Sequence, residues 1–122
     1  MEHETLLNRI MELDENVRFA GICDMNGRLE LKKQREGIQT LLDPNETQDT
    51  LQHAVNAWKS RMKHYDKTGK GLYTLAVYEN LRRVTMPLPD DYLLLVTIGK
   101  EGGQKQIVDR ILNQIYGDYT EF

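Results

Sequence analysis

Two periods of apolar and polar positions run through this chain, and each marks a kind of secondary structure. Near the beginning, Leu6, Leu7 and Ile10 recur at the three- and four-residue spacing of an amphipathic helix, with acidic residues on either side. The pattern predicts a helix over about residues 3–14. Such a helix has one apolar face, which another part of the fold must cover.

The residues after this helix alternate between apolar and polar types, which is the period of a strand with one covered face. Residues 17–24 form the first such run, and Leu29 and Leu31 resume the alternation after the tetrapeptide DMNG at 24–27. Asn and Gly tolerate the positive φ angles of tight turns. The pattern predicts a β-hairpin, followed by a loop over 34–42 that has no clear period.

A long helix is predicted to begin at Asp43. Asp is a good N-cap, Pro44 suits the first turn, and Glu46 stands in capping-box register. Apolar residues then hold one face of the helix over several turns, and Gly69 with Gly71 is expected to end it. The residues on that face are Leu51, Ala54, Val55, Trp58, Met62 and Tyr65.

Three extended runs follow, at 72–78, 81–86 and 92–98, separated by turn-rich segments. The last run contains the pentapeptide YLLLV, which is apolar on both faces. It therefore predicts a strand in the middle of the sheet, with helices covering both sides. Apolar residues at helical spacing after residue 103 predict a final helix that stops at Gly117.

The composition narrows the function classes. The net charge is −3 and the isoelectric point is near 5.6, so the totals show no attraction to nucleic acid or to an anionic membrane. No apolar stretch approaches the roughly 20 residues of a membrane-spanning helix. Cys23 is the one cysteine, which predicts a chain made for the reducing cytoplasm. The length of 122 residues predicts a single domain over 1–122, with a short C-terminal tail at 117–122.

Catalytic and metal-binding patterns are weak, so we expect no enzyme activity, no cofactor and no metal. His3, His53 and His64 are far apart and lack partners at ligand spacing. Cys23 has no adjacent histidine to act as a base, and a buried, inert thiol is the favoured interpretation. The glycine-rich segment 99–103 matches neither GxxxxGK[ST] nor GxGxxG, the two glycine patterns that bind nucleotide phosphates.

Positive charge gathers near the end of the long helix and in the loop after it. Cations at that position suit the helix dipole, and a solvated helix face is the usual explanation of such a run. The alternative is a patch that binds an anion or a protein partner, continued by two arginines of a following strand. The candidate residues are Lys59, Lys63, Lys67, Lys70, Arg82 and Arg83.

The order helix, two strands, helix, three strands, helix resembles the roadblock domain of the dynein light-chain type, which has a profilin-like fold. Residues 17–29, VRFAGICDMNGRL, resemble the first hairpin of that family, and most closely that of small archaeal roadblock-like proteins. The resemblance covers nearly the whole chain. It implies a three-layer α+β fold, in which a five-stranded antiparallel sheet lies between one helix on one face and two on the other. Similar hairpins occur in PAS, GAF and longin domains, so the element order carries most of the resemblance.

The resemblance also implies a homodimeric regulatory or scaffolding module without chemistry of its own, whose partner is a small GTPase or a larger assembly. In this family the long helix and the third strand typically form the dimer contact. An apolar sheet edge that pairs with its twin fits this arrangement. The helical residues fit an intramolecular core equally well. The positions carried over are Trp58, Met62, Tyr65, Tyr73, Leu75 and Val77.

A sensor domain of the PAS or GAF class is the alternative function. In that case the sheet, Trp58 and the tyrosines would surround a cavity for a small molecule. A solid core without a pocket would argue against the sensor, and a strict monomer with a blocked third-strand edge would argue against the dimeric module. Neither alternative involves nucleic acid or a membrane.

Overall fold

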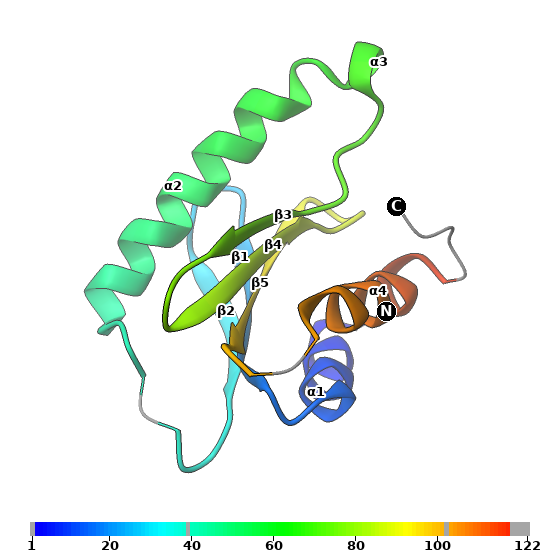
Figure 1. The fold of residues 1–122 in the computed structure, drawn as a ribbon. Helices are drawn as coiled ribbons and strands as arrows, with labels where there is room; N and C mark the ends of the chain where they lie inside the picture. The colour runs from blue at the N-terminus through cyan, green and yellow to red at the C-terminus, as the bar shows by residue number, and fades with distance from the viewer. Residues whose placement is uncertain (1, 39, 102, 118–122) are drawn as a thin grey trace.

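A five-stranded sheet with helices on both faces organises the chain (Figure 1). The computed structural model describes residues 2–38, 40–101 and 103–117, so the predicted tail lies outside the described residues beyond Gly117. The element order agrees with the order predicted from the sequence, with one short helix added. The elements are α1 (His3–Leu13), β1 (Val17–Asp24), β2 (Leu29–Gln34), α2 (Pro44–Met62), α3 (Tyr65–Thr68), β3 (Thr74–Val77), β4 (Leu81–Pro87), β5 (Tyr92–Gly99) and α4 (Gln104–Tyr116).

The strands lie in the order β2-β1-β5-β4-β3, and every neighbouring pair is antiparallel. β5 is therefore the central strand, as its sequence predicted. Leu93 and Leu95 face one side of the sheet, Leu94 and Val96 face the other, and all four are buried. A strand that is apolar on both faces is stable only with cover on both sides, which the helices supply.

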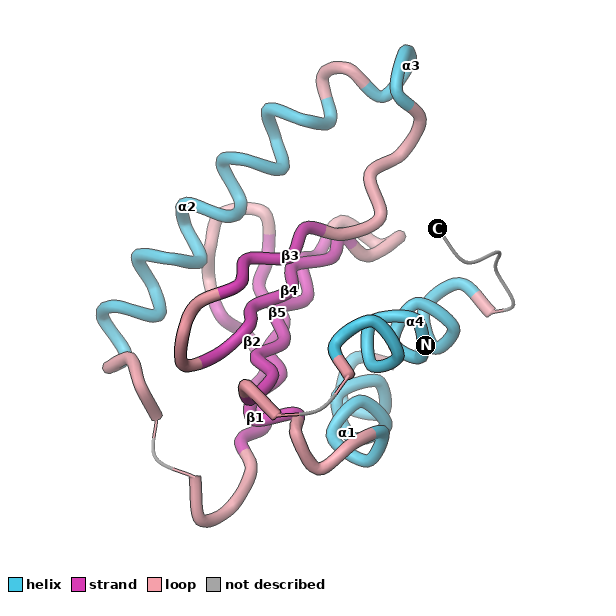
Figure 2. Tube along the Cα trace, in the orientation of Figure 1, coloured by secondary structure: helices cyan, strands magenta, loops and turns pink. Residues whose placement is uncertain are grey.

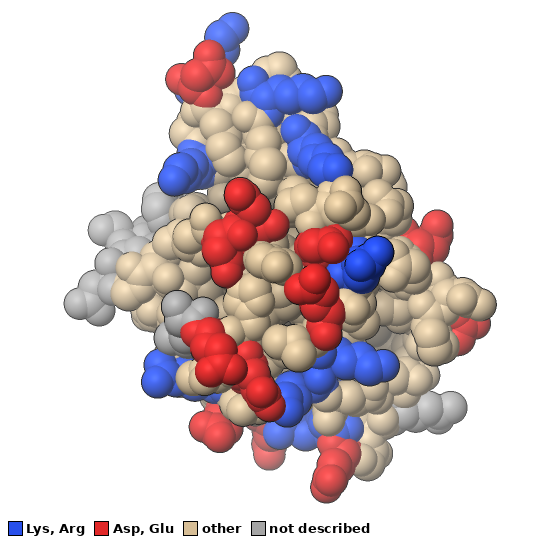
Figure 3. Space-filling model, turned by 180° about the vertical axis from the view of Figure 1, so that it is seen from behind, with Lys and Arg blue, Asp and Glu red and all other residues tan. Residues whose placement is uncertain are grey.

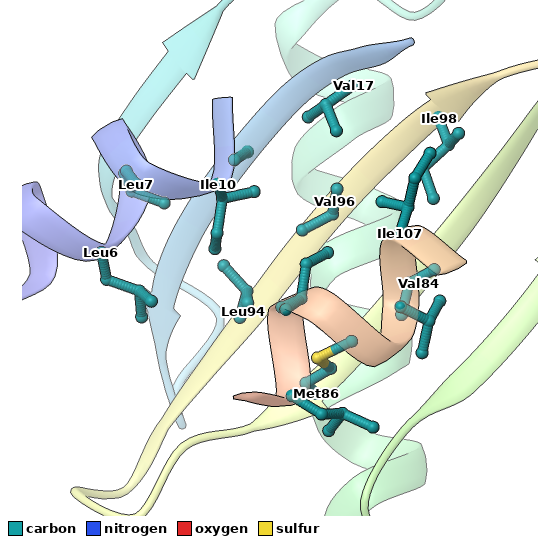
Figure 4. Packing of buried hydrophobic residues seen from close by; sticks show 14 of the residues in the cluster. Leu6, Leu7, Ile10, Val17, Val84, Met86, Leu94, Val96, Ile98 and Ile107 are labelled. Atoms are coloured by element: carbon teal, nitrogen blue, oxygen red, sulfur yellow. The ribbon is translucent and has the colours of Figure 1, made fainter. Parts of the chain in front are cut away.

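The larger core cluster lies between the sheet and the helices α1 and α4, which pack side by side on the same face (Figures 1 and 2). α1 contributes the apolar stripe that the sequence showed, and α4 contributes a second stripe at the same spacing. Figure 4 shows these side chains meeting above the strands. Its labelled members are Leu6, Leu7, Ile10, Val17, Val84, Met86, Leu94, Val96, Ile98 and Ile107.

The smaller core cluster lies on the opposite face, beneath α2. Its buried members are Cys23, Leu51, Val55, Trp58, Leu93 and Leu95. The capping box predicted for this helix is present: the Glu46 backbone N–H donates to Asp43 Oδ1 at 2.8 Å, and the Asp43 N–H donates to Glu46 Oε1 at 3.0 Å. These bonds satisfy two backbone donors that would otherwise lack partners, and they set where α2 begins.

α2 ends earlier than the sequence predicted. The prediction was one helix that continues to Gly69, whereas α2 stops at Met62 and α3 follows as a separate turn. The His64 N–H donates to the Arg61 carbonyl at 3.1 Å, which tightens the last turn. Most residues beyond Met62 are exposed, so packing against the sheet no longer supports a helix there. Gly69, at φ +80°, ends α3 instead.

The predicted hairpin turn joins β1 to β2 and is held by Asp24. Its Oδ1 accepts the backbone N–H groups of Asn26 at 2.9 Å and Arg28 at 3.0 Å. The hydrogen bond from Arg28 is the main cause that lowers the pKa of Asp24 below its ordinary value. Gly27 has φ +84°, and its carbonyl accepts a hydrogen bond from the Gln48 side chain. The tip of the hairpin is thereby tied to α2.

Candidate functional site

The two edges of the sheet differ in charge. β3 forms one edge with the sequence TLAV, which contains no charged residue, and Val77 at its end is 65% exposed. β2 forms the other edge and carries Glu30, Lys32 and Lys33. Charged side chains, especially lysines, hinder the pairing of an edge strand with another chain. The β3 edge is therefore the one suited to pairing.

The residues predicted for a dimer contact lie near this edge but on both faces of the sheet. Val77 pairs with Arg82, and Leu75 pairs with Val84, so both project toward the α1 and α4 face. Trp58 belongs to the α2 face and is only 1% exposed. The remaining three residues differ in their exposure and in the element that carries them. Met62 packs against the smaller core cluster, Tyr65 is half-buried on α3, and Tyr73 is exposed just before β3.

Trp58 is held in place from three sides. Its Nε1 donates to Thr85 Oγ1 on β4 at 2.9 Å, and the guanidinium of Arg61 stacks over its ring at 5.0 Å from the centroid. Gly71 lies against the ring, because a Cβ at that position would come within 2.5 Å of Cζ3. The indole therefore joins α2, β4 and the segment between α3 and β3.

The basic residues predicted to form one patch are divided by the structure. Lys59, Lys63, Lys67 and Lys70 are exposed near the end of α2 and around α3. Figure 3 shows positively charged side chains at the upper end of the molecule, where Figure 1 places α3. Lys59 lies in the last turn of α2, Lys63 is its C-cap, and Lys67 belongs to α3 together with Asp66.

Arg82 and Arg83 do not extend this group as one surface, because neighbouring residues of a strand project to opposite faces. Arg82 Nη2 donates to the carbonyls of Gly99, the last residue of β5, and of Glu101, just beyond it. Arg83 Nη2 donates to Thr50 Oγ1 of α2 at 2.9 Å. The structure thus places one arginine at the end of the sheet near α4 and the other beneath α2.

A groove of about 410 Å³ opens on the α2 face, between the first half of α2, the loop after β2 and the turn from β3 to β4. Its walls include Phe19, Thr50, Tyr78, Leu81, Arg83 and Leu95. The sensor alternative expected a cavity bordered by Trp58 and the tyrosines. Tyr78 does line the groove, whereas Trp58 is not among its lining residues. Sequence reasoning missed the groove because its walls come from segments that are far apart along the chain.

Arg83 is a charged residue in the lining of this groove. Its Nη2 donates a hydrogen bond to the Thr50 hydroxyl, and its guanidinium also hydrogen-bonds to the Tyr78 hydroxyl. Its buried Nε has no hydrogen-bond partner among the described residues. Burial lowers the pKa of Arg83, although at neutral pH the group remains protonated. A positive charge is therefore held between neutral groups in a partly apolar site.

The other residues considered for catalysis or metal binding are buried or paired with neighbouring side chains. Cys23 is fully buried, which confirms the predicted burial of this thiol, and burial is the main cause that raises its pKa to about 11. His3 Nε2 lies 2.6 Å from Asp90 Oδ2 and its ring packs edge-to-face on Tyr92. Across the described ranges, no group of three His, Cys, Asp or Glu side chains is placed to share a metal ion. Nor does any described helix combine the length and apolar character needed to cross a membrane.

Comparison with known proteins gives structural matches alone. No family model and no curated protein matches the sequence. Among solved structures, a roadblock/LC7 domain from Streptomyces avermitilis aligns with a TM-score of 0.68 and 10% identity, covering 94% of this chain and 95% of that one. The gliding protein MglB from Thermus thermophilus aligns with a TM-score of 0.70 and 11% identity, covering 92% and 84%. MglC from Myxococcus xanthus aligns with a TM-score of 0.60 and 17% identity, covering 93% and 95%.

These alignments confirm the predicted fold. The chain has the roadblock/LC7 fold, with its α+β architecture and a five-stranded antiparallel sheet, over nearly its whole length. Identities of 10–17% establish the fold and nothing finer. The special similarity to archaeal proteins stays a prediction.

Proposed function

We propose that this roadblock-fold chain works as a homodimeric, non-catalytic regulatory or scaffolding module, and that its partner is a small GTPase or a larger assembly. The observation that carries the proposal is the uncharged β3 edge with Val77 exposed, opposite a β2 edge that carries three charged residues. Two copies joined through β3 would form one continuous sheet by isologous pairing.

The helix α2 supports this arrangement. Its end and α3 extend past the packed part of the sheet (Figure 1), with Met62 and Tyr65 half-buried there. The Tyr65 hydroxyl is buried and lacks a hydrogen-bond partner within the part of the chain that the structure describes. A second copy across the β3 edge would lie close to these residues and cover their exposed sides.

We propose a non-catalytic role because the side chains that could act as a nucleophile or a base are engaged elsewhere. Cys23 is buried with a raised pKa, and His3 is paired with Asp90, so neither is placed to act as a nucleophile or a base. A buried free thiol also fits a cytoplasmic protein, which we include in the proposal.

The mass in solution tests the dimer directly. Light scattering over a range of concentrations should give twice the chain mass of 14.2 kDa for the wild type. Val77→Lys should give the single-chain mass with an unchanged circular dichroism spectrum, because a lysine on the edge strand obstructs pairing without touching the core. A wild-type monomer at all concentrations would contradict the proposal.

Leu31→Lys is the matched control. Leu31 is 38% exposed on β2 and, through its pairing with Ile22, projects to the same face of the sheet as Val77, but at the opposite edge. If β3 forms the contact, Leu31→Lys remains a dimer. Dissociation by Leu31→Lys, with Val77→Lys still dimeric, would place the contact on the β2 edge instead.

The GTPase part needs a separate experiment. Purified small GTPases loaded with GDP or with a non-hydrolysable GTP analogue can be tested for binding to the wild type and to Val77→Lys by interferometry. We expect binding that favours one nucleotide state and is weaker for the monomeric variant, because a dimer presents a composite surface. Equal binding of both nucleotide states would argue for a scaffold rather than a GTPase regulator.

A further inference from the structure

The groove on the α2 face has the dimensions of a small-molecule site. Its volume of about 410 Å³ lies within the range of roughly 300–1,000 Å³ that is usual for ligand pockets. Most of its wall is apolar and comes from Phe19 and Leu95 of the sheet, Leu81 at the start of β4, and Leu41 and Leu42 of the loop before α2. Leu41 is 52% exposed, so part of this apolar wall faces solvent.

Arg83 gives the groove a preference for negative charge. A half-buried guanidinium normally has a carboxylate partner, because burial of a charge is costly unless it is compensated. The partners of Arg83 are instead the neutral hydroxyls of Thr50 and Tyr78, and its Nε is left without a partner among the described residues. The chemistry of the site therefore favours an anion.

The other charged lining residues do not supply that anion. Glu79 is the acidic residue in the lining, but it is exposed on the turn between β3 and β4, and the described residues show no ion pair between it and Arg83. Arg18 adds a second positive charge to the lining. Arg83 is therefore the positive charge in the lining for which the described residues show no carboxylate partner.

We propose that this groove binds a small organic carboxylate with an apolar body, such as a medium-chain or aryl carboxylate. Its carboxylate would accept hydrogen bonds from the Arg83 guanidinium and from the Tyr78 hydroxyl, and its apolar body would cover Phe19 and Leu95. A planar guanidinium suits a carboxylate because it presents two parallel donors. The apolar walls select against small, fully hydrated anions, which gain nothing from them.

This site adjoins the proposed dimer contact at the turn after β3, where the lining residue Tyr78 follows Val77, but most of it lies elsewhere. The groove lies beside the first half of α2, where Thr47 and Thr50 line it, whereas the dimer proposal concerns the β3 edge and the end of α2. Ligand binding does not require dimerisation, so it would stand if the protein proved monomeric. Light scattering with and without ligand keeps the two outcomes apart.

Decanoate is the probe, and decan-1-ol is its uncharged counterpart. Isothermal titration calorimetry on the wild type should show saturable binding of decanoate at one site per chain. Arg83→Met keeps the length of the side chain and removes its charge, and it should weaken decanoate binding by about tenfold or more, as expected for loss of a charge-assisted hydrogen bond. Binding of decan-1-ol should change little, because the apolar walls remain.

Lys70→Met is the matched control, since it removes one positive charge from an exposed position in the loop after α3, away from the groove. It should leave the affinity for decanoate unchanged. If Arg83→Met fails to fold, Leu81→Glu replaces it: Leu81 is half-buried at the rim, and a negative charge there should repel decanoate.

Three results would overturn the proposal. The first is no saturable decanoate binding below about 1 mM, an affinity too weak to represent a built site. The second is an equal loss of affinity in Arg83→Met and Lys70→Met, which would indicate attraction to net charge alone. The third is decanoate binding that weakens as the protein associates, which would show that a second copy, and not a small ligand, occupies the groove.

Discussion

The Nε1 of Trp58 donates a hydrogen bond of 2.9 Å to the hydroxyl of Thr85, and this bond joins α2 to β4. The Thr85 hydroxyl lies in turn 2.7 Å from that of Thr74, at the edge strand β3. Because Trp58 is the one tryptophan of the chain, its fluorescence reports on this connection. The relationship links the helix predicted for the dimer contact to the strand predicted for the same contact.

Thr85→Val should destabilise the protein by about 1–3 kcal/mol, because it leaves the buried indole N–H without an acceptor and also removes the bond to the Thr74 hydroxyl. Urea unfolding followed by tryptophan fluorescence measures the change. Thr97→Val is the control: it lies on β5, on the same face of the sheet, and its hydroxyl has no hydrogen bond among the described residues. Equal destabilisation by both variants would show that the bond from Trp58 contributes nothing specific.

Gly71→Ala should destabilise by about 1–3 kcal/mol through overpacking. The new Cβ would lie 2.5 Å from Cζ3 of Trp58 and 3.3 Å from the Tyr65 hydroxyl oxygen, and the indole is held by its bond to Thr85. The emission of Trp58 should shift in the same variant. In Gly103→Ala the Cβ meets only the flexible end of Gln106, at 3.1 Å, so the change should stay below about 1 kcal/mol. A neutral Gly71→Ala would mean that the ring can move aside.

Arg35→Lys should cost about 1–3 kcal/mol, because one ammonium group cannot replace the bonds that the guanidinium makes. Arg35 Nη2 donates to the carbonyls of Met11 at 2.7 Å and Asp14 at 2.9 Å, and its Nε donates to that of Val17 at 3.1 Å. The first two belong to the end of α1, where a cation also complements the helix dipole. Thermal unfolding should show the loss, and Arg28→Lys in the exposed hairpin turn should not.

The stability of the fold should fall at alkaline pH because of Cys23. Burial raises its pKa from 9.0 to about 11, so the folded state keeps a proton that the unfolded state releases. The stabilisation is complete below pH 9 and is lost as the pH rises from 9 toward 11. Urea unfolding at about pH 8 and about pH 10.5 should show a larger decrease for the wild type than for Cys23→Ala. The folded protein should also resist thiol reagents at neutral pH, and rapid modification would contradict the burial.

The sequence by itself determined the kind and order of the main elements. The stripe of α1, the capping box of Asp43 and Glu46, the turn at Asp24 and the doubly apolar β5 each depend on residues close together along the chain. Local patterns of this type carry their own physical explanation, since capping, turn geometry and periodicity act over a few residues. The order of elements was then enough to suggest the roadblock fold, which the structural comparisons confirm.

Only the tertiary structure decided how distant segments meet. It ended α2 at Met62, where contact with the sheet stops, and it placed Arg82 and Arg83 on opposite faces of β4. It also assigned Arg35 to the end of α1, although the loop around that residue shows no period in the sequence. The groove has the same origin, because its walls come from separate strands, a helix and two connections. Such contacts depend on chain segments far apart in sequence, and no local period records which of them become neighbours.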